Sequence, residues 1–308
     1  MHEKINYNGW PHRIRLSNDE IELIVTTDIG PRIMRFGFIN GQNLLYPVPE
    51  HAGKTGGEEW RIYGGHRLWL APEALPFSYN PDNDKVEFEL QDKCIKLIQA
   101  KETITGIVKE IEITLSPDKN EVKVLHRLVN QNLEEVELAA WAITMLAPGG
   151  RAIIPQEPYG EGNDYLLPSR SLALWQYTKM NDPRWIWGEK YIQVKQDSLF
   201  ASEQKIGVTN KQGWTAYYLK GDVLIKKHRS SAHERCGDAP RPGIAGAECH
   251  HAERDDPFAK RRMHDIAALV EKHVGVAGLE QGVRALWPLA LEPEVEQRER
   301  VFDVVGLV

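Results

Sequence analysis

The densest group of side chains with chemical potential lies in residues 60–73, around a Gly-Gly pair. His66, Arg67, Trp69 and Glu73 stand close together there. An Arg guanidinium can bind two hydroxyls, a carboxylate or a phosphate, an aromatic ring can cover an apolar C–H face, and His or Glu can exchange protons. A sugar site requires these side-chain types. The segment therefore predicts His66 and Glu73 as proton-transfer groups, and Arg67 and Trp69 as binding groups.

The same segment has a purely structural interpretation. Both of its tryptophans could be core aromatics, with His66 and Arg67 in a buried hydrogen-bond network beneath a loop. The Gly-Gly pair favours a site, because it lets the backbone turn tightly and approach a ligand closely.

A second aromatic group contains Trp175 and the loop residues Arg184, Trp185 and Trp187. If this loop is extended, alternation places Trp185 and Trp187 on one side of it. We predict Arg184, Trp185 and Trp187 as further sugar-binding residues. For each single tryptophan, a place in the core is the alternative.

Several sequence motifs of nucleotide and metal sites are absent. The chain has no phosphate-binding Gly-x-x-x-x-Gly-Lys-Ser/Thr loop, no Gly-x-Gly-x-x-Gly, no His-Glu-x-x-His and no Cys-x-x-Cys. A Cys/His/Asp group at 249–251 and 264–265 has the donor types that zinc prefers, but its spacing fits no compact site. We therefore expect neither a metal nor a cofactor.

The elements that must position these residues are short strands. Residues 107–115 alternate between apolar and polar side chains, as a half-buried strand does. Runs at 122–128 and 136–145 follow after turn residues, which predicts a three-strand meander. Similar short runs occupy the chain from residue 13 to about 226, without a long amphipathic helix. This pattern predicts an all-β fold, a large antiparallel β-sandwich.

Composition excludes several classes of protein. The 308 residues are 42% hydrophobic and 27% charged, which is typical of a globular protein, and the net charge of −6 provides no basic surface for nucleic acid. The sequence has no run of 18 apolar residues and no apolar segment at its beginning, so we expect no membrane partner and a cytoplasmic location. Three scattered cysteines argue against a disulfide framework and fit a reducing compartment.

The composition changes near residue 227. Residues 228–308 contain no Asn, Thr or Tyr, and have nine Arg and two Lys against 10 Arg and 17 Lys before them. We therefore divide the chain into two parts. Residues 1–227 are expected to form a β-sandwich that is incomplete because its last strands are missing, and residues 228–308 to form a compositionally discontinuous tail that is either frame-altered or unrelated. Residues 228–262 are expected to be disordered and 263–274 to form an amphipathic helix. Without further strands, the sandwich is expected to leave a sheet edge or a cavity wall uncovered.

Residues 27–36 read Thr-Asp-Ile-Gly-Pro-Arg-Ile-Met-Arg-Phe, and residues 41–46 read Gly-Gln-Asn-Leu-Leu-Tyr. This pair resembles the opening hairpin of the galactose mutarotase-like (aldose 1-epimerase-like) superfamily. The stretches at 63–69, 141–150 and 205–214 resemble an uncharacterised family within it. The resemblance covers about residues 8–227.

The resemblance implies a galactose mutarotase-like sandwich whose concave face binds a monosaccharide. True mutarotases use a glutamate base and a histidine acid to open the sugar ring. His66 and Arg67 correspond to early basic pocket residues, and at least one of Trp141, Trp185 and Trp187 is expected beside them. Trp141 thereby joins the predicted binding residues. The stretch comparable to that of the family's catalytic histidine carries Trp141 and Thr144, and the family's glutamate base would fall in the tail.

Three functional hypotheses follow, with a small-molecule sugar as the expected partner and the oligomeric state left open. The first is a mutarotase-like epimerase or a relative that acts on a modified sugar. The second is a non-catalytic carbohydrate-binding module that has the aromatic and Arg groups without the acid and base. The third is a truncated or frame-altered product without a function of its own.

Overall fold

The computed structural model describes residues 2–158, 160, 169–228, 284–294 and 303–305, the last two ranges by their backbone alone. Within these ranges the secondary structure consists of strands and two 3-10 turns, η1 (Pro49–His51) and η2 (Phe77–Tyr79). The predicted helix at 263–274 lies outside the described residues, as does the predicted disorder at 228–262 except for its first residue, His228, which is in a strand.

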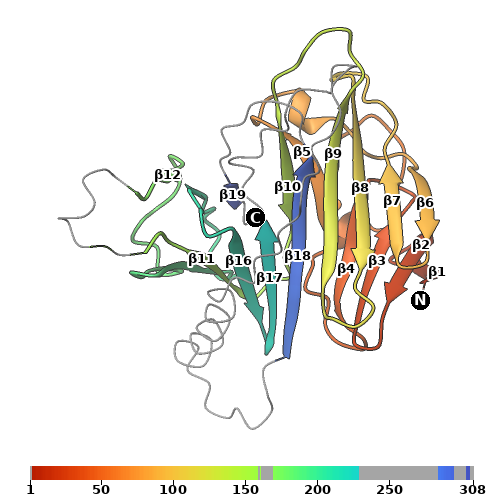
Figure 1. Cartoon of the computed structure of the whole chain (residues 1–308). Coiled ribbons are helices and arrows are strands. Elements are labelled where there is room, and N and C mark those ends of the chain that lie inside the picture. The colour runs from red at the N-terminus through yellow and green to blue at the C-terminus, as the bar shows by residue number, and fades with distance from the viewer. Residues whose placement is uncertain (1, 159, 161–168, 229–283, 295–302, 306–308) are drawn as a thin grey trace, which may run out of the picture. The chain divides into compact units, whose positions relative to one another are not determined.

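The strands form three sheets (Figure 1). In spatial order, the six-stranded sheet contains β1 (His2–Tyr7), β2 (Trp10–Ser17), β3 (Ile21–Thr26), β4 (Arg32–Phe38), β5 (His66–Ala71) and β10 (Ala139–Thr144). The ten-stranded sheet contains β13 (Trp185–Trp187), β14 (Tyr191–Lys195), β11 (Arg151–Pro155), β16 (Trp214–Leu219), β17 (Asp222–His228), β18 (Arg284–Glu294), β9 (Val122–Asn130), β8 (Ile107–Leu115), β7 (Cys94–Ile98) and β6 (Glu87–Gln91). A small sheet contains β12 (Leu172–Leu174), β15 (Ile206–Val208) and β19 (Asp303–Val305).

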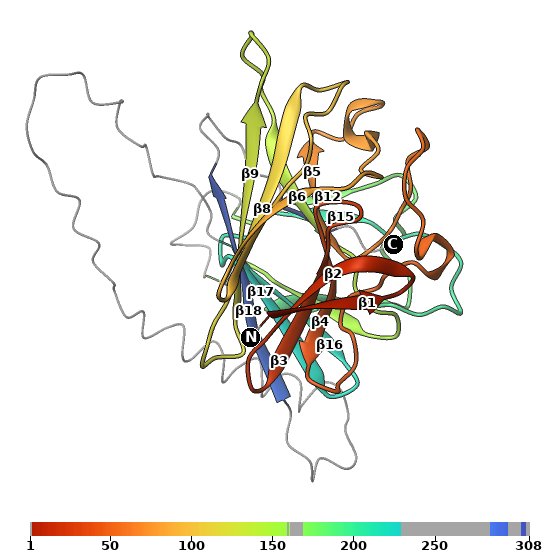
Figure 2. The same cartoon turned by 90° about the vertical axis from the view of Figure 1, so that its right-hand side faces the viewer.

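The two large sheets share one buried apolar core. Ile14 and Ile33 reach it from the six-stranded sheet, and Ile111 and Val124 reach it from the ten-stranded sheet. Figure 2 shows β1 to β4 in one layer and β8 and β9 in another. Two sheets that interdigitate their apolar inner faces form a β-sandwich. The predicted all-β fold with antiparallel sheets is confirmed.

The predicted meander at 107–145 is wrong in its third strand. β8 and β9 are antiparallel neighbours, as alternation predicted, but β10 pairs with β5 in the opposite sheet. Residues 131–138 connect β9 to β10 and are enough to carry the chain from one sheet to the other. This crossing places Trp141 directly opposite Trp69.

The expected open sheet edge after residue 227 is also wrong. β18, which no pattern in the sequence predicted, pairs in parallel with β17 on one side and with β9 on the other. The backbone of residues 284–294 therefore joins the two halves of the ten-stranded sheet. Among the described strands of the ten-stranded sheet, β17 with β18 and β18 with β9 are the parallel pairs.

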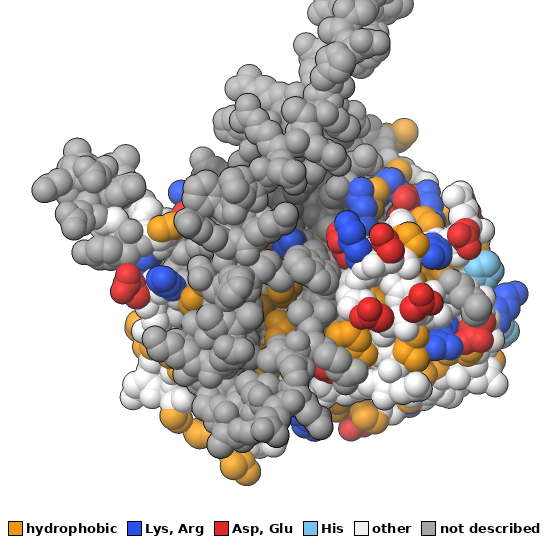
Figure 3. Space-filling view, turned by 60° about the horizontal axis from the view of Figure 1, so that its bottom comes forward, with side chains coloured by type: hydrophobic (Ala, Val, Ile, Leu, Met, Phe, Trp, Pro, Cys, Tyr) orange, Lys and Arg blue, Asp and Glu red, His pale blue; other side chains and the backbone are white. Residues whose placement is uncertain are grey.

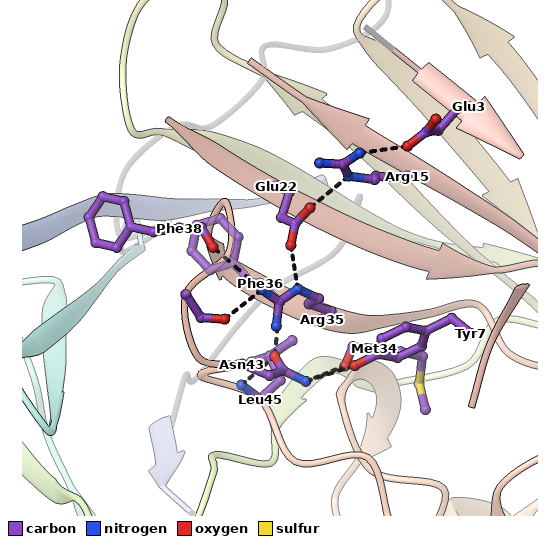
Figure 4. A network of polar contacts seen from close by, with 11 residues as sticks. Glu3, Tyr7, Arg15, Glu22, Met34, Arg35, Phe36, Phe38, Asn43 and Leu45 are labelled. Carbon is purple, nitrogen blue, oxygen red and sulfur yellow. Dashed lines mark hydrogen bonds and ion pairs between the residues drawn. The ribbon is translucent and has the colours of Figure 1, made fainter. Parts of the chain in front are cut away.

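A polar network fixes the first four strands relative to one another (Figure 4). Glu22 accepts from Arg15 at 2.6 Å and from Arg35 at 2.7 Å, and Arg15 also binds Glu3 at 2.6 Å. Asn43 closes the following turn by accepting from the backbone N–H of Phe36 at 3.1 Å. Much of the opening hairpin motif thus has a structural role.

Candidate functional site

The register of the six-stranded sheet sorts the chemically useful residues onto two faces. Arg13, Thr26, Arg32 and Arg67 form one row across β2, β3, β4 and β5. The neighbouring row contains His66 and apolar side chains of the shared core, and it continues to Thr144 of β10. Because successive side chains of a strand point to opposite faces, Arg67 points away from that core and His66 points into it.

Five aromatic residues gather on the face that carries Arg67, and we call them the aromatic cluster. Trp69 of β5 is central: its ring lies 5.8 Å from that of Trp60, 5.1 Å from that of Tyr79 and 5.5 Å from that of Trp141, each edge to face. Lys205 links Trp141 to the fifth member, Trp175, since its Nζ lies 5.7 Å and 4.5 Å from the two ring centroids.

Arg67 is held inside this cluster by aromatic faces. Its guanidinium carbon lies 4.0 Å from the centroid of Trp69 and 5.5 Å from that of Trp60, and only 7% of the residue is exposed. Its Nη1 is buried and has no hydrogen-bond partner among the described residues. Burial, with a smaller effect of the neighbouring Arg32, lowers the pKa of Arg67 to about 9, so it remains a cation at neutral pH.

Two further donors of the cluster are also left without acceptors. The indole Nε1 atoms of Trp60 and Trp141 are buried and have no partner among the described residues. A buried N–H without an acceptor costs free energy that a ligand oxygen can recover. Together with Arg67 Nη1, they give the cluster three buried donors without an acceptor among the described residues.

No family model, curated protein or solved structure matches the chain. The site therefore has to be interpreted from its own geometry. Within the described ranges, no three His, Cys, Asp or Glu side chains are arranged to hold a metal ion, and no helix is long and apolar enough to cross a membrane. On the face in Figure 3, basic and acidic side chains of the described residues are intermingled.

Glu73 lies at the exposed rim of the aromatic cluster. Its Oε1 accepts from the Tyr79 hydroxyl at 2.6 Å, and its Oε2 lies 3.1 Å from Lys205 Nζ. The bond from Tyr79 is the main cause that lowers the pKa of Glu73, and the same bond raises the pKa of the Tyr79 hydroxyl. Glu73 is thus ionised at neutral pH, with both oxygens engaged.

Arg67 also borders a small pocket of about 40 Å³ at the end of β5 and β10. Other polar groups around it belong to Thr144, Gln196 and Tyr217. Burial raises the pKa of Tyr217 to about 12, and its hydroxyl donates to the carbonyl of Ala147. The pocket therefore offers a neutral hydroxyl lining beside one buried cation.

The Gly-Gly pair at 64 and 65 lines this pocket and has positive φ angles of 81° and 71°. A Cβ on Gly64 would lie 2.0 Å from the carbonyl oxygen of Tyr46, and one on Gly65 would lie 2.3 Å from that of Ile33. The pair is thus required in part by close approach to the protein's own backbone.

His66 belongs to a separate buried group between the sheets. Its Nε2 shares a hydrogen bond of 2.8 Å with Nε2 of His126 on β9, and its Nδ1 lies 2.8 Å from the hydroxyl of Thr144. Lys226 Nζ donates to that hydroxyl at 3.3 Å. Burial lowers the pKa of both imidazoles, that of His126 to about 3. The structure therefore does not place His66 with Arg67 and Glu73, although Thr144 touches both the pocket and His66.

Arg184, Trp185 and Trp187 form another group, at the β13 edge of the ten-stranded sheet. The two indoles stack at 5.1 Å, and each has an acceptor: Gln204 for Trp185 and the Met180 carbonyl for Trp187. Arg184 binds Asp182 through two nitrogens at 2.9 Å. These side chains are satisfied internally, which favours a structural role over the predicted sugar binding.

Of the predicted site residues, the structure thus unites Arg67, Trp69, Glu73 and Trp141. Sequence reasoning did not assign Trp60, Tyr79, Trp175 or Lys205 to the site. Lys205 stands in a stretch that carries the family resemblance, which was the one available signal for it.

Proposed function

We propose that the protein binds a monosaccharide or a sugar derivative at the aromatic cluster. The observation that carries this proposal is the combination of aromatic rings with three buried donors, on Trp60, Arg67 and Trp141, for which the described part of the chain supplies no acceptor. Sugar hydroxyls are acceptors for such donors, and the C–H face of a pyranose packs on an indole ring. The resemblance to the galactose mutarotase-like superfamily supports the same class of ligand.

Mutarotation is the second candidate, on the strength of that resemblance. It requires an acid and a base that face the same ligand. Glu73 lies at the rim of the cluster with both oxygens occupied, and His66 points into the core on the other face of β5. The geometry therefore supports sugar binding better than proton transfer.

The two candidates can be separated by NMR. Saturation-transfer difference spectra with a panel of aldoses and their derivatives measure binding, and exchange spectra between the anomers measure mutarotation. We expect binding without accelerated exchange. Arg67→Ala should weaken binding by roughly 1.5 to 3 kcal/mol, or about 10- to 150-fold, because the charged donor is lost.

Trp187→Ala is the matched control, since Trp187 lies in the separate β13 group. It should leave affinity for the sugar unchanged. The proposal is wrong if no sugar of the panel binds, or if Arg67→Ala binds as well as the unmodified protein.

A further inference from the structure

The charges around Arg67 are not balanced. Arg32, its neighbour in the same row, is neutralised by Asp82 through an Nη2 to Oδ2 contact of 2.5 Å. At the rim, Lys205 and Glu73 neutralise each other at 3.1 Å. No carboxylate of the described residues forms an ion pair with Arg67, so this part of the site carries one net positive charge.

An uncompensated cation in this environment is unfavourable. Arg67 is 7% exposed, and its guanidinium lies against the faces of Trp60 and Trp69. The nearby carboxylate of Asp82 attracts it but is already paired with Arg32. A cation–π contact offsets only part of the free energy that the desolvation of a charge costs. The lowered pKa of Arg67 reflects the same cost. A ligand that brings one negative charge to Nη1 would offset it.

The planar guanidinium selects the form of that charge. An Arg binds a carboxylate through parallel N–H donors, and the carboxylate's single charge equals the excess at the site. A phosphate monoester carries about −1.5 to −2 charges at neutral pH and would exceed it. The pocket beside Arg67, at about 40 Å³, also suits a small planar group.

We propose, resting on the sugar-binding function above, that the natural ligand is a sugar acid. Its carboxylate meets Arg67, and its ring packs on the aromatic cluster beside Trp69. The indole N–H groups of Trp60 and Trp141 donate to its remaining oxygens.

Titration calorimetry on the full chain tests this assignment with matched sugars: glucose, glucuronate and glucose 6-phosphate, then galactose, galacturonate and galactose 6-phosphate. In at least one series the uronate should bind tenfold or more tightly than the neutral sugar, and more tightly than the phosphate. Arg67→Gln should reduce this preference to less than about threefold. Arg170→Gln, which removes an exposed guanidinium elsewhere, should retain it.

The outcomes distinguish the two proposals. If neutral sugars bind as tightly as the uronates, the proposal of a sugar acid is wrong, whereas the proposal of sugar binding is supported. Tighter binding of a sugar phosphate overturns the carboxylate assignment. If no member of either series binds, both proposals fail. If Arg67→Gln does not fold, two measurements on the unmodified protein test the sugar-acid proposal. These are its preference for the uronate over the neutral sugar, and the expected weakening of uronate binding as the salt concentration rises from 50 to 500 mM.

Discussion

The buried imidazole pair predicts a loss of stability in mild acid. His66 and His126 share one hydrogen bond between their Nε2 atoms, so one ring donates and the other accepts while both are neutral. Burial is the largest cause of the lowered pKa values, followed for His66 by its neighbour His126, and Lys226 acts on both rings. Protonation therefore favours the unfolded chain, in which imidazoles titrate near 6.5.

The sign and size follow from proton linkage. A depressed folded-state pKa contributes stability above about pH 6.5, and this stability is lost as the pH falls toward the folded value. For His126, with a folded pKa of about 3, the loss between pH 7 and pH 5 is about 2 kcal/mol, at about 1.4 kcal/mol per pH unit. His66 acts in the same direction. The lowered pKa values of Glu73 and Asp182 stabilise the folded chain above about pH 4.5, and this contribution is lost only below that pH, outside the interval from pH 7 to pH 5.

Urea unfolding of the full chain at pH 7, 6 and 5 measures this loss. We expect the free energy of unfolding to fall by about 2 to 4 kcal/mol, and His126→Gln to remove about half of the fall. His2→Gln, at an exposed position, is the control and should leave it unchanged. Histidine ring ¹⁵N shifts give an independent readout, in which both rings remain neutral at pH 5. A change in stability below 0.5 kcal/mol, or rings that titrate near 6.5, would refute the reasoning.

Two matched pairs of substitutions test the glycine turn and the buried ion pair. Gly64→Ala should cost more than about 2 kcal/mol of unfolding free energy, because it adds a backbone clash to a strained φ; Gly149→Ala, with open space around its Cβ, isolates the φ term and should cost less. Lys109→Met leaves the buried carboxylate of Glu102, 2.5 Å from Lys109 Nζ, without its ion-pair partner. It should lower the free energy of unfolding by roughly 3 to 5 kcal/mol, and adding Glu102→Gln should restore part of this loss. The partly exposed Lys96→Met should cost less than about 1 kcal/mol. Equal costs within either pair, measured by urea unfolding, would contradict these explanations.

The local sequence pattern was sufficient to predict a strand where that strand has one buried and one polar face. Residues 107–115 alternate clearly and form β8 with the predicted bounds. Pairing is a non-local property, so no local pattern could show that β10 leaves β9 for β5, or that 284–294 inserts beside β17.

The candidate site was predictable only in part. Five consecutive residues of β5, from His66 to Leu70, are buried, so both faces of this strand are covered. The segment therefore lacks the alternation of apolar and polar residues that would have marked it as a strand with His66 and Arg67 on opposite faces. Read as a strand, the segment would have placed the two on opposite faces. Tyr79, Trp175 and Lys205 come from other segments, and only the folded chain brings them to Trp69 and Trp141.

The indole N–H groups provide the most direct test of sugar binding at the aromatic cluster. In protein labelled with ¹⁵N-tryptophan, and with signals assigned through Trp60→Phe and Trp141→Phe, galacturonate and glucuronate are titrated. The indoles of Trp60 and Trp141 have no acceptor within the described ranges, whereas those of Trp185 and Trp187 already donate hydrogen bonds. We predict saturable downfield shifts for the first two signals and unchanged positions for the others. Shifts confined to Trp185 and Trp187, or no shift at any indole, would contradict a sugar site at this cluster.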